Sequence, residues 1–359
     1  MKAKTTTNIS VRQICFIMLA YTVVGKLLTY PTALSFFCER DLLFPALIDF
    51  LIEGIIIWGV AFLCSRTDKT FFELLKGTIG NIGARIVFGF FAVLFLLAAL
   101  VPLFEQELYV HTIFYDTVPP LAIFVPFFIF AIYAGGKRFQ NIGRCADLCM
   151  PIFVITMLVI FIMSCGEAKW DNLLPVLKTP AKDIFGAAAG NIFRFVEPCW
   201  MLMFMGRFKY KKGDAAKITV SYAAGAVIVI FFLATFYAIY GGLAPSRTYA
   251  ISRTSLYFSA IDTIGRIDLI MLYVLETVML FGLVLNIQLA VYAISECSGW
   301  ERSGVISLFV NIALAAVLIA CDGFYNSVYN LYNQWLWIYF LIFTVLIPVL
   351  AWTLKRRQR

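Results

Sequence analysis

The sequence predicts an all-α polytopic membrane protein, and three observations support that fold class. The chain has 359 residues, of which 62% are hydrophobic and 14% charged, whereas about 25% of a typical soluble domain is charged. Stretches such as 222–243 and 331–354 contain few charges and are long enough to cross a hydrocarbon core of about 30 Å as helices. Their apolar runs are continuous rather than alternating, which excludes the strand pattern of a membrane β-barrel.

We expect about ten transmembrane helices in one integral membrane domain that covers residues 1–359. Their expected limits are 12–37, 42–64, 85–115, 120–134, 146–165, 184–206, 217–242, 268–296, 303–321 and 332–354. Most of the 29 Lys and Arg residues fall in alternate loops, counted from the N-terminal segment. Because basic residues accumulate in cytoplasmic loops, both termini are expected in the cytoplasm. The net charge of +8 is therefore a topology signal, and we expect no nucleic-acid partner.

Two of the expected helices, the first and the sixth, are interrupted near the middle of the membrane. In the first, TVVGKLLTYP is interrupted at Gly25-Lys26, and in the sixth, FGAAAGNIFRFVEPCW is interrupted at Gly190-Asn191. A proline follows in each case. The sequence therefore predicts two broken helices.

The broken helices belong to a predicted internal repeat. Amphipathic segments that end in Thr-Ile-Gly, 69–80 and 251–265, precede the third and the eighth expected helix. Because an odd number of helices separates the matching features, the second half is expected to be inverted in the membrane, with halves at about 9–165 and 183–354. Such paired interruptions indicate a transporter-type binding site. The alternative is that Gly and Pro are simply frequent in transmembrane helices.

Charged side chains lie at similar depth in several expected helices, where burying each one costs roughly 2.5–3.5 kcal/mol. They are Lys26, Asp49, Glu53, Arg194, Glu197 and Glu276, with Glu105 nearer the outer end. One interpretation is a hydrated cavity in which Lys26 or Arg194 engages a ligand carboxylate. Glu197 or Glu276 would then engage a ligand amine or titrate.

The other interpretation is that these charges pair and hold the bundle together. Arg194 and Glu197 have the i,i+3 spacing at which two helical side chains meet. Glu53, with Asp49 one turn away on the same face, is expected to pair with Lys26.

An enzyme, a metal site and a cofactor are not expected. The nine cysteines form no CxxC pair and the chain has a single histidine, so neither a zinc site nor a histidine-based triad can be built. The sequence also lacks a GxSxG motif and a phosphate-binding P-loop.

The opening ISVRQICFIMLAYTVVGKLLTYP resembles the N-terminal signature of the spore germination protein B family, the GerAB type. The segments DNLLPVLKTPAKDIFGAAAGNIFRFVEP and SRTSLYFSAIDTIGRIDLIML fit the same family, as do the chain length and the number of spans. The resemblance covers essentially the whole chain.

This resemblance implies the amino acid–polyamine–organocation superfamily and a LeuT-like fold of two inverted five-helix repeats. It implies an integral membrane subunit of a nutrient germinant receptor, in the spore inner membrane or the cell membrane, that senses amino acids or other small nutrients. An A-type membrane subunit and a C-type lipoprotein would be its partners, within the lipid bilayer.

The resemblance also implies where the ligand binds. In the superfamily the ligand lies where helices 1 and 6 unwind, lined by helices 3 and 8. By position, these residues are Gly25, Lys26, Gly190, Asn191, Arg194 and Glu197, with Glu105 and Glu276. This sequence departs from the family at Lys26, where a small or uncharged residue is usual, and at Glu276, in a usually apolar stretch. Lys26 would then either fill part of the cavity or select an anionic or otherwise unusual ligand.

Two further functions need the same polar centre. One is an amino-acid transporter of the same fold, proton-coupled or exchanging. The other is a water or ion conduit.

Overall fold

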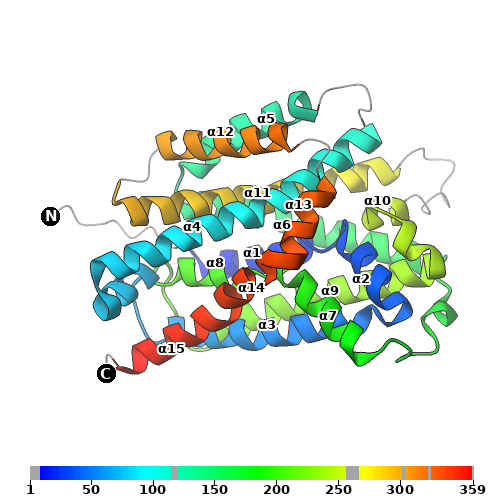
Figure 1. The fold of residues 1–359 in the computed structure, drawn as a ribbon, viewed down its shortest axis with the longest axis horizontal. Coiled ribbons are helices and arrows are strands. Elements are labelled where there is room, and N and C mark those ends of the chain that lie inside the picture. Colours follow the sequence, from blue (N-terminus) through cyan, green and yellow to red (C-terminus); the bar gives the residue numbers. More distant parts are fainter. Residues whose placement is uncertain (1–8, 115–119, 256–266, 301–303, 322–324, 358–359) are drawn as a thin grey trace.

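The computed structural model describes residues 9–114, 120–255, 267–300, 304–321 and 325–357, which form a bundle of helices (Figure 1). Within these ranges there is no strand. The all-helical fold class is confirmed.

The first predicted interruption is present. Helix α1 (Val11–Val24) begins with a capping box, because the Ser10 hydroxyl accepts from Gln13 N at 3.3 Å and Gln13 Oε1 accepts from Ser10 N at 3.1 Å. Helix α2 (Tyr30–Cys38) starts with a proline in its first turn, where the missing N–H costs no hydrogen bond. Residues 25–29 between the two helices are the first break.

The second predicted interruption is also present, slightly later in the chain than expected. Helix α7 (Ala181–Asn191) still contains Gly190 and Asn191, so both residues are helical. A 3-10 turn (Ile192–Arg194) follows, and helix α8 (Glu197–Phe204) again carries proline in its first turn. Residues 192–196 are the second break. Every residue of α8 is buried, so this short helix lies in the core of the bundle.

The remaining helices complete the bundle. They are α3 (Leu43–Cys64), α4 (Phe71–Phe114), α5 (Pro120–Gly135), α6 (Phe139–Cys165), α9 (Asp214–Tyr240), α10 (Ala250–Ser255), α11 (Ile267–Ser298), α12 (Gly304–Ala320), α13 (Tyr325–Leu331), α14 (Trp337–Leu341) and α15 (Ile347–Arg357). Short 3-10 turns lie at Glu39–Asp41, Trp170–Leu173 and Gly241–Ser246. The π-helical turns Tyr332–Leu336 and Ile342–Leu346 join α13, α14 and α15.

Helix α4 consists of two helices that meet at Gly80. There φ is +79°, a left-handed conformation that glycine adopts without a steric penalty. The kink separates the predicted amphipathic segment from the long apolar helix after it. Of the corresponding segment 251–265, most lies outside the described residues.

Helix packing brings distant parts of the chain together. Helix α11 packs along α4, and α9 packs against both α1 and α3. Helices α5 and α12 pair at one edge of the bundle (Figure 1). Helix α3 also packs against α7 and α8, the two helices on either side of the second break.

Six helical stretches in the described residues are long and apolar enough to cross a membrane. They are Leu43–Cys64, Phe71–Glu107, Phe139–Cys165, Asp214–Ser246, Tyr273–Ser298 and Gln334–Ala351. Three shorter apolar helices accompany them, at Val11–Val24, Phe124–Gly135 and Gly304–Ala320. The larger number of spans expected from the sequence stays a prediction.

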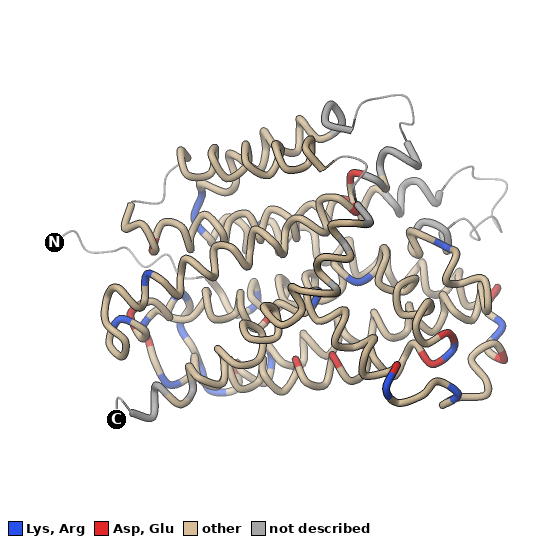
Figure 2. Tube along the Cα trace, viewed as in Figure 1, with Lys and Arg blue, Asp and Glu red and all other residues tan. Residues whose placement is uncertain are grey.

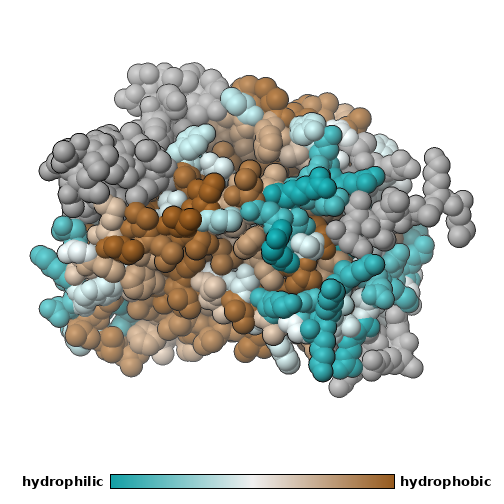
Figure 3. Space-filling view, turned by 180° about the vertical axis from the view of Figure 1, so that it is seen from behind, coloured by the Kyte–Doolittle hydropathy of each residue, from teal (hydrophilic) through white to brown (hydrophobic). Residues whose placement is uncertain are grey.

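The outer surface suits a lipid environment. Large apolar side chains are exposed, such as Ile82 and Ile162, each with 75% of its surface accessible. Figure 3 shows an apolar belt bordered by hydrophilic residues. Lys and Arg gather near the end of the bundle where α15 finishes, whereas Asp and Glu are more frequent towards the other end (Figure 2). The orientation of the bundle in the membrane stays a prediction.

Candidate functional site

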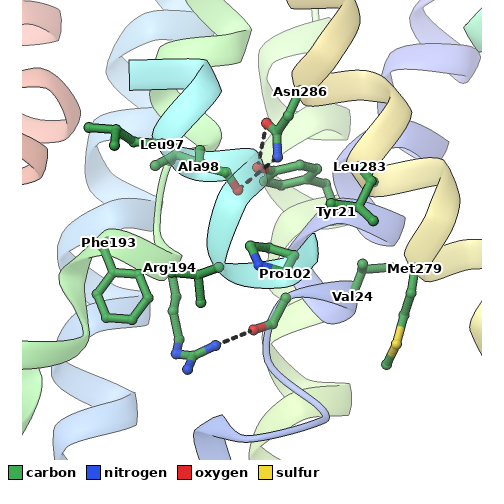
Figure 4. A pocket seen from close by; sticks show the side chains of 14 residues that line it. Tyr21, Val24, Leu97, Ala98, Pro102, Phe193, Arg194, Met279, Leu283 and Asn286 are labelled. Atoms are coloured by element: carbon green, nitrogen blue, oxygen red, sulfur yellow. Dashed lines mark hydrogen bonds between the residues drawn. The ribbon is translucent and has the colours of Figure 1, made fainter. Parts of the chain in front are cut away.

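A cavity of about 40 Å³ lies between the two breaks (Figure 4). It is lined by α1 and the first break, by α4, by the second break and by α11. The lining residues are Tyr21, Val24, Gly25, Leu97, Ala98, Val101, Pro102, Phe193, Arg194, Val196, Met279, Gly282, Leu283 and Asn286. Since a water molecule needs roughly 10–15 Å³ of such volume, the cavity has room for about three waters. Its lining is mostly apolar, with polar side chains supplied by Tyr21, Arg194 and Asn286.

Arg194 connects the two breaks at one end of this cavity. Its guanidinium donates to the Gly25 carbonyl at 3.2 Å, to Thr29 Oγ1 at 2.8 Å and to Glu105 Oε1 at 2.9 Å. The Thr29 hydroxyl donates to the same Glu105 oxygen at 2.5 Å. The side chains of Arg194 and Glu105 are each 3% exposed. The planar guanidinium of Arg194 thus binds the Glu105 carboxylate of α4 and the Gly25 carbonyl oxygen of the first break.

Tyr21, Pro102 and Asn286 form a second polar group in the cavity wall. Pro102 lies inside α4 and has no N–H, so the Ala98 carbonyl one turn earlier lacks its helical donor. The Asn286 amide donates to that carbonyl at 3.2 Å, and its Oδ1 accepts from the Tyr21 hydroxyl at 2.8 Å. Sequence reasoning missed all three residues. The sequence feature that could have pointed to them is a proline inside one long apolar helix, together with an asparagine inside another.

A separate cluster of buried polar side chains lies next to the breaks, outside the cavity lining. Lys26 Nζ is 2.6 Å from Glu197 Oε1, and neither side chain is exposed. The ammonium also lies 4.4 Å from the centroid of the Phe195 ring and 5.6 Å from that of Phe50, close enough for cation–π attraction. The Tyr222 hydroxyl donates to Glu53 Oε2 at 2.7 Å.

The structure changes two pairings expected from the sequence. Lys26 pairs with Glu197 and not with Glu53. Arg194 pairs with Glu105 and not with Glu197, because the i,i+3 argument requires a continuous helix and the second break separates these two residues.

The other predicted site residues lie elsewhere. Asn191 donates to the Ala187 carbonyl of its own helix at 2.9 Å, and neither it nor Gly190 lines the cavity. Glu276 faces the Gln106 side chain, whose amide donates to the Glu276 carboxylate, at 2.7 Å to one oxygen, once its oxygen and nitrogen are exchanged. Asp49 is buried one turn before Glu53. Of the predicted ligand residues, Gly25 and Arg194 line the cavity and Glu105 binds Arg194 directly.

Within the described ranges, no group of three or more His, Cys, Asp or Glu side chains could hold a metal ion.

Comparison with known sequences identifies relatives of this chain. The family described as "Spore germination protein" matches residues 8–324. The spore germination protein YndE of Bacillus subtilis (strain 168) is 24% identical over 245 residues, which are 67% of this chain. The match spans 66% of the length of YndE, slightly less than two thirds.

Comparison with solved structures identifies transporters of similar fold. A mutant of the Eremococcus coleocola manganese transporter superposes with a TM-score of 0.55 at 12% identity, over 95% of this chain and 78% of the transporter. The same transporter in complex with an aromatic bis-isothiourea substituted compound has a TM-score of 0.55 at 12% identity, over 97% and 79%. At this identity the similarity concerns the fold alone.

Proposed function

This chain belongs to the spore germination protein family, and we propose that it is the integral membrane subunit of a spore nutrient germinant receptor. It binds a small nutrient such as an amino acid in the cavity between the two breaks and signals germination. Its partners are an A-type membrane subunit and a C-type lipoprotein. It lies in the spore inner membrane or the cell membrane, with both termini in the cytoplasm.

The observation that carries this proposal is the position of Arg194 in the cavity. A guanidinium binds a carboxylate through two parallel hydrogen bonds, which suits the carboxylate of a small nutrient. Glu105 already supplies such a carboxylate, at 2.9 Å. A nutrient carboxylate would replace Glu105 on Arg194 and release the α4 side chain. Ligand binding would thereby change the contact between α4 and both breaks.

The breaks themselves support a ligand site. Backbone N–H and C=O groups that leave a helix inside a membrane must be satisfied by protein, water or ligand. One of them, the Gly25 carbonyl, already faces the cavity and accepts from Arg194. Interrupted helices supply ligand-binding backbone groups in transporters for the same reason.

We further propose the inverted arrangement of two five-helix halves, about 9–165 and 183–354. It is supported by the similarity of the two breaks. In both halves a short helix ends, about one turn of non-α backbone follows, and the next helix carries proline in its first turn, Pro31 in one case and Pro198 in the other. Mapping which loops are accessible to an impermeant thiol reagent would test this topology and the orientation of the termini.

The alternative function is an amino-acid transporter of the same fold, proton-coupled or exchanging. The fold similarity to a manganese transporter favours it, since that protein moves a solute across a membrane. The cavity serves either function. Uptake of amino acids by liposomes that contain the purified chain would separate transport from receptor signalling.

The test of the proposed site is to fill the cavity at Gly25. This residue has φ −74° and ψ 0°, which any residue adopts, and a Cβ atom added there meets nothing within 4 Å. Gly25→Ala and Gly25→Leu therefore occupy the cavity without straining the backbone. Spores that carry them should need at least about tenfold more nutrient to germinate, equivalent to about 1.4 kcal/mol of binding energy, at normal protein level by immunoblot.

The matched control is Gly186→Leu in α7. A Cβ atom added at Gly186 also meets nothing within 4 Å, but Gly186 does not line the cavity. It should leave the dose response unchanged. An unaltered response to every nutrient in Gly25→Leu spores would refute the site.

A further inference from the structure

We propose that Glu53 and Glu197 form a proton-binding site, in which the two carboxyl groups share one proton beside Lys26. This site is distinct from the nutrient cavity, because none of Lys26, Glu53, Glu197 and Tyr222 lines that cavity. The inference goes beyond the proposed receptor function and does not depend on which ligand is bound.

Each carboxyl group has one oxygen that is already occupied by a protein donor. Glu197 Oε1 accepts from the Lys26 ammonium at 2.6 Å, and Glu53 Oε2 accepts from the Tyr222 hydroxyl at 2.7 Å. For the remaining oxygens, Glu53 Oε1 and Glu197 Oε2, the described residues offer no N–H or O–H donor.

The two remaining oxygens belong to neighbouring side chains, and both are buried without a hydrogen-bond partner. Glu53 lies on α3 and Glu197 at the start of α8, two helices that pack against each other, and the two carboxyl groups are close enough to interact. An ionised carboxylate has no hydrogen to donate, so two of them in contact only repel. A single proton converts the contact into an O–H···O hydrogen bond and supplies the missing donor.

The charge balance of the cluster leads to the same conclusion. Lys26 contributes one positive charge, and two ionised glutamates would contribute two negative charges. Lys26 and Glu197 have no exposed surface and Glu53 is 3% exposed, so water cannot stabilise the excess charge. The other cation at the breaks, Arg194, is bound to Glu105. One shared proton makes the cluster of three ionisable side chains neutral.

The surrounding groups do not remove this need for a proton. The titratable side chains that face the cluster from neighbouring elements are Tyr21 on α1, Tyr30 on α2, Asp49 on α3, Cys199 on α8 and Tyr222 on α9. All are neutral or negative, and Asp49 adds acidity next to Lys26. No cation among them could replace the proton.

The position of the site links it to the cavity. Lys26 follows the cavity residue Gly25, and Glu197 follows the cavity residue Val196. Release of the proton would leave two like charges between α3 and α8, and their repulsion would move the start of α8. Proton occupancy would therefore alter the same two breaks that hold the nutrient.

Infrared difference spectroscopy of the purified chain tests the proposal, since a protonated carboxyl group has its own C=O stretching band, which shifts in D₂O. At neutral pH, the difference spectrum of wild type minus variant should show the loss of one such band in Glu53→Gln and of the same band in Glu197→Gln. Glutamine has the shape of a protonated glutamate and can donate to the remaining carboxylate, so both variants should fold. The control Asp49→Asn should keep the band.

Three results would overturn the proposal. The first is a wild-type protein without the band at neutral pH. The second is a difference spectrum in which neither glutamine variant has lost a band, because the proton then lies elsewhere. The third is a band that disappears in Asp49→Asn alone, which would assign the proton to Asp49. If the band is absent and the melting temperature rises with added Na⁺ or K⁺, a metal cation and not a proton joins the carboxylates.

Discussion

Lys26 Nζ and Glu197 Oε1 lie 2.6 Å apart, and neither side chain has any exposed surface. Lys26 belongs to the first break and Glu197 begins the helix after the second. The ion pair therefore joins two segments that are far apart in the sequence. Its ammonium is also enclosed by the rings of Phe195 and Phe50. A charge buried so completely depends on its partner, because no water can replace it.

The Lys26–Glu197 pair should behave as a unit under mutation. Lys26→Met leaves an uncompensated buried charge, and we expect a loss of about 3–5 kcal/mol of stability. The double variant Lys26→Met/Glu197→Met should recover most of this loss, measured as melting temperature in detergent. Lys26→Met/Glu53→Leu, built on the pairing expected from the sequence, should recover less. A Lys26→Met/Glu197→Met protein no more stable than Lys26→Met would contradict the pairing.

Arg194 should not be replaceable by lysine. An ammonium keeps the charge but cannot reach the Gly25 carbonyl, Thr29 and Glu105 with the planar fork of a guanidinium. We expect Arg194→Lys to be present at near-normal level, because Glu105 retains a counter-charge. Its germination response should nevertheless require at least about tenfold more nutrient. Arg194→Met should lower the protein level itself. Equal nutrient responses in wild type and Arg194→Lys would argue against carboxylate recognition by this residue.

Asp41 should control the order of the segment before α7. Its carboxylate accepts three backbone hydrogen bonds, from Leu177 at 2.7 Å and from Lys178 and Thr179 at 2.8 Å each. Asp41→Asn places an NH₂ group against some of these N–H donors, and each lost charged hydrogen bond costs about 1.5–3 kcal/mol. Limited proteolysis of residues 174–180 should become faster in Asp41→Asn. The control Asp171→Asn alters an exposed carboxyl nearby and should be cut at the wild-type rate.

The same contacts predict a pH dependence. Burial acts to raise the pKa of Asp41, but the hydrogen bonds from Thr179, Leu177 and Lys178 outweigh it and hold the pKa below the ordinary value of 3.8. Because the folded-state pKa is lowered, the stabilisation is complete above pH 3.8 and is lost as the pH falls through the folded-state pKa. Proteolysis of this segment by an acid-active protease should therefore accelerate below pH 3.8 in the wild type. In Asp41→Asn this acceleration should be absent.

Two glycines with positive φ should differ in their tolerance of alanine. A Cβ atom on Gly206 (φ +72°) would lie 2.7 Å from backbone atoms of Lys69 and Thr70, whereas one on Gly213 (φ +95°) would meet nothing within 4 Å. Both changes incur the left-handed strain, but Gly206→Ala adds an overlap that costs about 1–3 kcal/mol more. Melting temperatures should rank wild type, then Gly213→Ala, then Gly206→Ala. The reverse order of the two variants would be inconsistent with the close approach of these backbones.

The fold class and the two breaks could be predicted from the sequence because composition and glycine–proline placement act locally. The candidate charges were also recognisable, because a charge in an apolar helix is conspicuous. Their pairing was not, because it depends on how non-adjacent helices pack. Arg194 was expected to meet Glu197 by its i,i+3 spacing, which fails because the second break lies between them. The cavity wall formed by Pro102 and Asn286 depends on a carbonyl released by one helix and bound by another, a relation that no local pattern records.

The contacts between the two breaks have a mechanical consequence. Lys26 forms an ion pair with Glu197 at the start of α8, and Arg194 donates a hydrogen bond to the Gly25 carbonyl. The two interrupted segments therefore contact each other at two points. Neither can bend alone without breaking a buried ionic or hydrogen-bonded contact. A displacement of either break must therefore either move the other break with it or break one of these two contacts.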